Sequence, residues 1–360
     1  MYKLYVCNSA GAKVAYIKDL VPFNGNTVLK FSDYISSYGQ LTFRVQTKDP
    51  LASTGIFSPY QNHVKVYRNN VVVWCGIIAN CPQRNRRFIE VEARTYAYLM
   101  SKVAVAHTAD KDYREFTSGN ISTAITTIFN EGKNRGNSPI ADFTLGTVTN
   151  PKYPWDSGVD FVFTTDIASR FQASSLLQVI MNMADVSNSD FTVSKDKVFT
   201  FMPEIGETKP NVVFKYGKGG NVDDYNSPLD GTNMSNDLYC ASLDKEGLRI
   251  IDKEIEDTSL YQTYYRLWSS ILFGEYLTQN LLNERAKKIL SLNKLPDTQL
   301  DLMLNDKAAP FGTYDLGDYI TVMIEDGAIN VNKERRIIGW DVAVSDSGVE
   351  SVTVSTNDRI

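Results

Sequence analysis

Apolar and polar residues alternate in short runs through the first 105 residues, and this alternation limits the fold more than any other feature of the chain. A period of two residues is typical of strands with one buried and one exposed face. Asn69 and Asn70 separate two of the runs, and asparagine tolerates the positive φ of a tight hairpin turn. The pattern predicts an antiparallel β-domain of the barrel or sandwich type. The runs are Tyr2–Val6, Gln40–Gln46, His63–Arg68, Val71–Trp74 and Phe88–Ala93.

The end of the chain repeats this pattern. A glycine-containing strand, Trp74–Ile78, leads through a polar turn to Phe88–Ala93 in the first segment. In the last segment, Arg336–Val342 leads in the same way to Val349–Val354. The parallel predicts a second β-domain that is related to the first.

Between the two β segments the sequence has helical periodicity in three places. Apolar residues share one helical face from Ile121 to Phe129, after Ser118 and Asn120 as candidate caps. A second helix is expected from Phe171 to Ala184, followed by a hairpin over residues 191–201. A third helical stretch is expected over residues 258–292, with Leu281, Leu282, Ile289 and Leu290 as its apolar stripe and Pro296 after its end.

Two glycine-rich stretches are predicted to be irregular. The residues from Gly132 to Pro154 are expected to form a loop, and no role is assigned to the region 132–158. Gly217–Gly220 lacks the pattern of a phosphate-binding loop and is expected to form a turn.

These patterns predict an α+β fold, mainly β, in which two related antiparallel, barrel-like tube domains flank a mixed α+β insert. The first β-domain is expected over residues 1–105. The insert is expected over 106–208 and 257–296, and the second β-domain over 209–256 and 297–360.

The sequence offers few groups for catalysis or metal binding. His63 and His107 are its two histidines, and neither belongs to a metalloprotease or hydrolase motif. Cys75 and Cys81 are separated by five residues with no histidine nearby, which does not fit a zinc site. Cys7 and Cys240 complete an irregular set that fits a reducing cytoplasm.

Neighbouring carboxylates occur at Asp223 and Asp224 and along Glu254–Asp257. A glycosidase requires two carboxylates opposed across a cleft, and no pair in the sequence is marked for that role. We therefore expect no catalytic residue, no cofactor and no metal site, and a protein that is not an enzyme.

Charge is unevenly distributed along the chain. Residues 1–105 hold 13 Lys and Arg against 5 Asp and Glu, whereas the remainder holds 24 against 37. This polarity suits a subunit whose two ends meet different partners, although chance variation between two solvated domains would produce it too. Arg84–Arg87 is the densest basic cluster. Without a recognition helix or an arginine-rich tail, it fits a charged hairpin tip better than a phosphate contact.

No leader segment opens the chain, and no run of about 18 apolar residues could span a membrane. We therefore expect neither secretion through a leader nor a membrane span.

The order of these elements resembles the tail hub family of tailed bacteriophages, which includes baseplate hubs and the N-terminal hub part of siphophage tail-associated proteins. Three stretches carry the resemblance: Val64–Leu99, Ser174–Val193 and Ala286–Val322. Membership would imply a homotrimer in which two tube-like β-domains per subunit form a pseudo-sixfold ring. That ring would adapt the tail tube to a spike or fibre, with DNA passing through its lumen. Its expected contacts are the tail tube or distal tail protein, the spike or fibre, and the tape measure protein.

The resemblance further implies a structural virion protein at the tail tip or baseplate, assembled in the host cytoplasm and acting in host attachment and genome ejection. Relatives with peptidase or lysozyme domains carry them after the hub, and we expect such activities to lie in another protein. A glycosidase stays open as the enzyme alternative, and activity on cell-wall polymer that is lost with one carboxylate substitution would favour it. Two alternatives without catalysis stay open as well. One is a distal tail ring protein, which is usually hexameric. The other is a β-module that binds host glycans through exposed Tyr and Trp.

Overall fold

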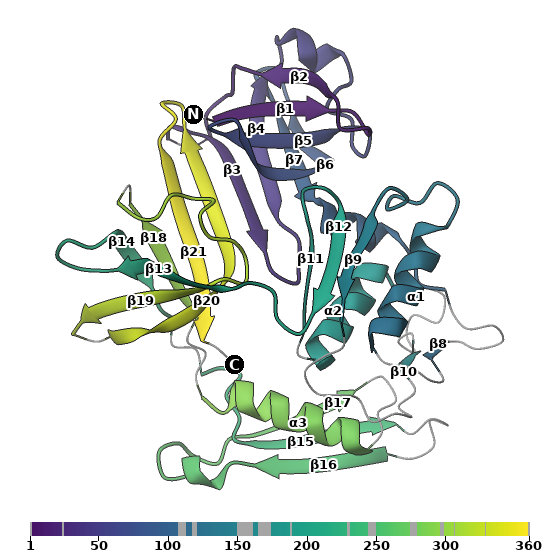
Figure 1. Cartoon of the computed structure of the whole chain (residues 1–360), viewed down its shortest axis with the longest axis vertical. Helices are drawn as coiled ribbons and strands as arrows, with labels where there is room; N and C mark the ends of the chain where they lie inside the picture. The colour runs from purple at the N-terminus through teal and green to yellow at the C-terminus, as the bar shows by residue number, and fades with distance from the viewer. Residues whose placement is uncertain are drawn as a thin grey trace.

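The computed structural model describes residues 2–23, 25–106, 113–116, 121–149, 161–164, 174–187, 189–228, 231–243, 250–273, 279–295, 299–305, 307–327 and 329–358. Within these ranges, thirteen strands form one sheet, and two further layers of helices and short strands lie beside it (Figure 1). The strands of the large sheet come from both ends of the chain, so the two predicted β segments meet in one structure.

The large sheet is built from an early and a late group of strands. The early strands are β1 (Tyr2–Cys7), β2 (Lys13–Ile17), β3 (Thr27–Tyr34), β4 (Gln40–Gln46), β5 (His63–Arg68), β6 (Val71–Arg84) and β7 (Phe88–Thr95). The late strands are β13 (Thr208–Lys215), β14 (Val222–Asn226), β18 (Leu300–Leu304), β19 (Tyr319–Asp326), β20 (Ile329–Ser345) and β21 (Glu350–Asp358). We call these groups the first and the second β unit.

Both β units have the same strand order. Neighbouring strands run β3-β4-β7-β6-β5-β1 in the first unit and β14-β18-β21-β20-β19-β13 in the second. β2 continues the first unit beyond β1 and has no counterpart in the second. Strands in corresponding places also follow one another in the same order along the chain. One direction differs, because β1 is antiparallel to β5 whereas β13 is parallel to β19. The repeated pattern in the sequence therefore corresponds to a repeated topology.

The two units are joined edge to edge. β3 pairs with β20 in antiparallel register from Gly339 opposite Tyr34 to Ser345 opposite Thr27. Beneath this joint, Phe31 packs against Trp340 with ring centroids 5.8 Å apart. The indole of Trp74 donates a hydrogen bond of 3.0 Å to a backbone oxygen of β3. One apolar core therefore extends under both units.

Within the described residues, neither unit closes into a barrel, which corrects the barrel-like form expected for both β-domains. A single bridge joins Leu20 to Val45 in the first unit, and another joins Tyr216 to Val222 in the second. In the first unit, β3 occupies the edge of β4 only from Leu29 to Phe31 before it continues onto β20. The strand that would close the first unit is thus shared with the second.

A salt bridge also connects the two units at the side of the sheet. Arg68 on β5 contacts both carboxylate oxygens of Glu350 on β21, at 2.8 and 2.5 Å. The hydroxyl of Tyr2 donates a third hydrogen bond to the same carboxylate at 2.5 Å. Burial alone would raise the pKa of Glu350, but the hydrogen bonds from Arg68 and Tyr2 outweigh it and lower that pKa.

Two smaller layers accompany the sheet, each with a core of its own. The first layer, on the right of Figure 1, follows β7 and contains a 3₁₀ helix (Tyr96–Lys102), β8 (Tyr113–Phe116), α1 (Ile121–Lys133), β9 (Thr144–Val148), β10 (Phe161–Thr164), α2 (Leu176–Ser187), β11 (Asp190–Val193) and β12 (Val198–Met202). The second layer, at the bottom of Figure 1, lies between β14 and β18 in the chain and contains β15 (Asp237–Leu243), β16 (Ile250–Glu256), β17 (Trp268–Phe273) and α3 (Gln279–Asn293).

Several predicted elements are confirmed. α1 covers the predicted apolar face from Ile121 to Phe129, and β11 and β12 form the predicted hairpin. Asn69 and Asn70 both have positive φ in the turn between β5 and β6. The candidate caps Ser118 and Asn120 and the expected helix start at Phe171 lie outside the described residues.

Other predictions are corrected. The expected helical stretch 258–292 contains a short 3₁₀ helix (Thr258–Leu260) and α3 from Gln279, but Trp268–Phe273 between them forms β17. Alternating Trp268, Ser270 and Leu272 on the exposed side of that strand fit a sheet and not a helix. The region 132–154 contains β9, which pairs with β12. The stretch 209–256 is divided, since β13 and β14 join the large sheet whereas β15 and β16 pair together beside it.

Replacing Gly339 should destabilise the joint. A Cβ at this position would lie 2.4 Å from the ring of Tyr34. We expect Gly339→Val to lower the free energy of unfolding by about 1–3 kcal/mol, because the ring must leave its place. Gly136→Val is the matched control, since nothing lies within 4 Å of the added Cβ there. Equal denaturation midpoints for both variants would contradict this account.

The Glu350 contact should give stability that depends on pH. Because the folded-state pKa is lowered, the contribution is complete above the unfolded-state pKa and is lost as pH falls through the folded-state value. We expect Glu350→Gln to cost about 1–3 kcal/mol at pH 7 and progressively less in acid. Chemical denaturation across pH measures this. Glu325→Gln, an exposed acid of the same unit, serves as the control, and a loss independent of pH would refute the expectation.

Candidate functional site

The side of the joined sheet that faces away from the core is polar. Along β3, Leu29 and Phe31 point into the core, so Lys30 and Ser32 point to the opposite side. The same alternation operates in the neighbouring strands of both units. The resulting polar face is lined by Lys30, Ser32, Tyr34, Gln40, Thr42, Arg94, Asp341, Ser351 and Thr353.

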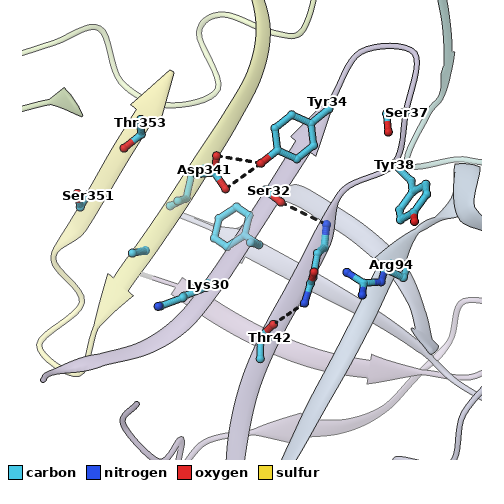
Figure 2. A pocket seen from close by; sticks show the side chains of 14 residues that line it. Lys30, Ser32, Tyr34, Ser37, Tyr38, Thr42, Arg94, Asp341, Ser351 and Thr353 are labelled. Carbon is cyan, nitrogen blue, oxygen red and sulfur yellow. Dashed lines mark hydrogen bonds between the residues drawn. The ribbon is translucent and has the colours of Figure 1, made fainter. Parts of the chain in front are cut away.

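This polar face is hollowed at the joint. Figure 2 shows Tyr34 from β3 and Asp341 from β20 pointing toward one another across the line where the units meet. The hollow has a volume of about 750 Å³. A second hollow, with Asp33 and Asp318 in its lining, is also shared by the two units. We treat the one on the polar face as the candidate functional surface, because the hydrogen bond from Tyr34 to Asp341 crosses the joint there.

One hydrogen bond crosses the joint on this surface. The hydroxyl of Tyr34 donates to both carboxylate oxygens of Asp341 at 3.1 and 3.2 Å. Burial raises the pKa of Tyr34, and the charge of Asp341 raises it further. Burial also raises the pKa of Asp341, although the hydrogen bond from Tyr34 opposes this shift. The pair holds the two units in register and leaves no activated nucleophile.

Charges on the polar face are largely paired. Arg44 contacts Glu90 at 2.6 Å, and Arg94 lies 3.5 Å from Glu92. Arg44 is thus paired with an acid on the neighbouring strand β7, and Arg94 with an acid of its own strand. The second unit adds Asp341 together with serine and threonine hydroxyls. Such a surface is well hydrated and only weakly charged.

His63 is buried, and its role is structural in this geometry. Its Nδ1 lies 3.2 Å from the hydroxyl of Tyr96. Burial, reinforced by the charge of Lys197, lowers the pKa of His63 to about 4, so the ring is neutral at pH 7. His107, the other histidine of the sequence, lies outside the described residues.

The cysteines are separate thiols. Cys75 belongs to the core of the first layer, whereas Cys81 is half-buried and donates to the backbone oxygen of Phe57. Burial raises the pKa of Cys75 to about 12, which makes it a poor nucleophile. In the described part of the chain, no group of three or more His, Cys, Asp and Glu side chains could hold a metal ion.

The remaining predicted residues lie apart from the polar hollow. Asp223 and Asp224 lie on β14, where Asn305 donates a hydrogen bond of 2.8 Å to Asp223. Glu254 and Glu256 are exposed on β16, both within 3.7 Å of Arg266. Gly217–Gly220 forms a turn, as predicted. The Arg84–Arg87 cluster is an exposed tip between β6 and β7.

Sequence reasoning missed the polar hollow itself. The alternation in Thr27–Tyr34 was available as a signal, because its polar positions share one face. The partner of that face, β20, lies more than 300 residues away in sequence, and no local pattern indicates that the two strands pair. Across the described residues, no helix is both long and apolar enough to cross a bilayer.

No protein-family model matches the sequence, and no curated protein matches it either. Solved structures do match in fold. A tail protein from Neisseria meningitidis is similar with a TM-score of 0.66 and 11% identity, over 99% of this chain and 96% of that chain. The 43 kDa tail protein of prophage MuSo2 from Shewanella oneidensis has a TM-score of 0.67 and 11% identity, over 99% and 98%.

Two further structures extend the likeness. Prophage tail protein gp18 from Listeria monocytogenes has a TM-score of 0.59 and 12% identity, over 99% of this chain and 95% of that chain. The c3393 protein of E. coli, a component of the type VI secretion system, has a TM-score of 0.50 and 10% identity, over 95% and 76%. That protein is itself described as similar in structure to the T4 tail proteins gp27 and gp5. The resemblance inferred from the sequence is thus confirmed as one of fold: this chain has the fold of bacteriophage tail proteins.

Proposed function

We propose that the chain is a structural virion protein that forms a trimeric hub at the tail tip or baseplate and catalyses no reaction. The observation that carries this proposal is the repeated β unit, present twice in one chain and joined edge to edge. Three chains contain six such units. In a closed ring of three chains, the sheets of these six units would be related by approximate sixfold symmetry. Such a ring would therefore match a sixfold tube on one side and a threefold spike or fibre on the other.

The polar face supports a place for this sheet around a lumen. Its side chains are hydroxyls, amides and paired charges, such as Arg44 with Glu90. A wall of this kind stays hydrated. It holds a passing DNA duplex weakly, because few Lys and Arg side chains are available to neutralise DNA phosphates and release the counterions of the DNA. Passage of the genome during ejection requires weak contact of this kind.

The two ends of the molecule offer different surfaces for neighbours in a tail. At the top of Figure 1, β1, β2 and β5 present lysines and tyrosines, with Lys13 lying 4.2 Å from the ring centre of Tyr5. At the bottom, β16 and β17 present Glu254 and Glu256 together with exposed Trp268. We propose that these two ends contact the neighbours of a hub in the tail, which are the tail tube or distal tail protein, the spike or fibre, and the tape measure protein. We do not assign either end to a particular neighbour.

A glycan-binding role is the second candidate. Tyr265 and Trp268 are 88% and 63% exposed in the second layer, and sugar rings stack on aromatic side chains of this kind. Such a role is compatible with host attachment by a hub in the virion. A distal tail ring would instead require six copies of the chain.

The oligomeric state tests the proposed hub. Light scattering of the purified chain at high concentration should give the mass of a trimer, three times 40.4 kDa. A hexamer would replace the hub with a distal tail ring. A strict monomer that binds cell-wall glycans would replace it with the glycan-binding module.

Weak contact with DNA is the second expected outcome. At about 0.15 M salt, a labelled duplex should show no binding tighter than about 10 µM, the range of non-specific electrostatic binding. Removing the acids that neutralise the face, in Glu90→Gln with Glu92→Gln, should strengthen binding and make it more sensitive to salt. The matched control is Glu254→Gln with Glu256→Gln, outside the polar face. Fluorescence anisotropy measures both, and tight binding by the unaltered chain would contradict a passive lumen.

A further inference from the structure

The joint inside the chain uses two strands whose counterparts have free edges. β3 is the edge strand of the first unit, and it pairs with the later half of β20 in the second unit. By strand order, the counterpart of β3 is β14, and the counterpart of β20 is β6. Among the described residues, β14 pairs with β18 alone apart from the bridge at Val222, and β6 beyond Asn80 pairs with β7 alone.

We propose that β14 of one copy pairs, antiparallel, with the later half of β6 in the next copy. This contact would reproduce between chains the joint that β3 and β20 form within a chain. The occupant of each free edge is therefore a second copy of this protein. The inference rests on the proposed function only for the number of copies that close the ring.

The charges at these two edges are complementary. Arg84, Arg86 and Arg87 are exposed at the end of β6, whereas Asp223 and Asp224 are exposed near the start of β14. In the internal joint, the end of β20 lies opposite the start of β3, with Ser345 paired to Thr27. If β6 and β14 of two copies pair in the same antiparallel direction, the end of β6 lies opposite the start of β14. The arginine cluster of one copy then lies opposite the two aspartates of the next. The arginine cluster and the two aspartates would thus form a single contact between chains.

The free edge of β6 also has features that discourage indiscriminate pairing. Irregularities interrupt its register between Ile78 and Asn80 and between Asn80 and Gln83. Pro82 lies in the second irregular stretch and has no N–H to donate. Bulges, proline and arginine are devices that protect an edge strand from aggregation. A partner strand that carries acidic residues can still pair with this edge, through the β6 residues on either side of Pro82.

Disulfide trapping tests the contact directly. Gln83 lies opposite Glu90, so its side chain belongs to the polar face of the sheet. Asp224 and Asn226 lie on the same face of β14, opposite Met303 and Asp301. Because the bulges leave the register open, Gln83→Cys is combined in turn with Asp224→Cys, Asn226→Cys or Pro228→Cys, each in a Cys81→Ser background. Six strands separate β14 from β6 within a chain, so a link between them must join two chains. We expect covalent trimers on non-reducing gels for at least one pair. The control, Gln83→Cys with Thr353→Cys, places the second thiol in the middle of the sheet and should give none.

Charge reversal tests the contact without cross-linking. Asp223→Lys with Asp224→Lys should weaken trimer formation by about tenfold or more, and adding Arg84→Glu with Arg86→Glu should restore it. Reversing Glu254 and Glu256 to lysine, away from both edges, should leave the trimer unchanged. A wild-type trimer with no trapped pair and no effect of reversal would overturn this joint and leave the hub standing. A wild-type monomer at all concentrations would overturn both.

Discussion

The pairing of β3 with β20 is the contact on which the rest of the structure depends. Without it, the first and second β units would be two curled sheets, each with an open edge. The pairing fuses them, places Phe31 against Trp340 in one core, and lays a single polar face across the boundary. Gly339 allows the ring of Tyr34 to lie over the backbone at the start of the joint. Burial and hydrogen bonding at one line of contact therefore determine both the fold and the surface it displays.

How far the sequence could predict this depends on distance along the chain. Local signals located the Asn69–Asn70 turn, α1 and the β11–β12 hairpin, because each is determined by residues within about twenty positions. Composition was misleading for Trp268–Phe273, where a strand was assigned to a helix. The candidate surface could not be found at all, since Tyr34 meets Asp341 only after strands from opposite ends of the chain pair. Pairing of that kind has no local sequence signal.

The chemistry of the described residues is consistent with a role in assembly. His63 is held neutral against Tyr96, Cys75 is buried, and the exposed acids of β16 lie beside Arg266. Among the groups whose pKa is shifted, Glu350 beside Arg68 and Tyr34 beside Asp341 lie where one β unit meets the other. These two contacts join side chains of the first unit to side chains of the second.

The two outer layers have a consequence for symmetry. One layer follows β7 of the first unit, and the other is inserted between β14 and β18 of the second, so the two units carry different attachments on the same sheet. Around any closed ring of these chains, the inner surface repeats at every unit, while each kind of attachment recurs only at every second one. A neighbour that contacts the sheet therefore meets twice as many equivalent positions as a neighbour that contacts a layer. In the trimeric ring proposed above, one polypeptide would supply both the sixfold and the threefold symmetry, without a separate adaptor.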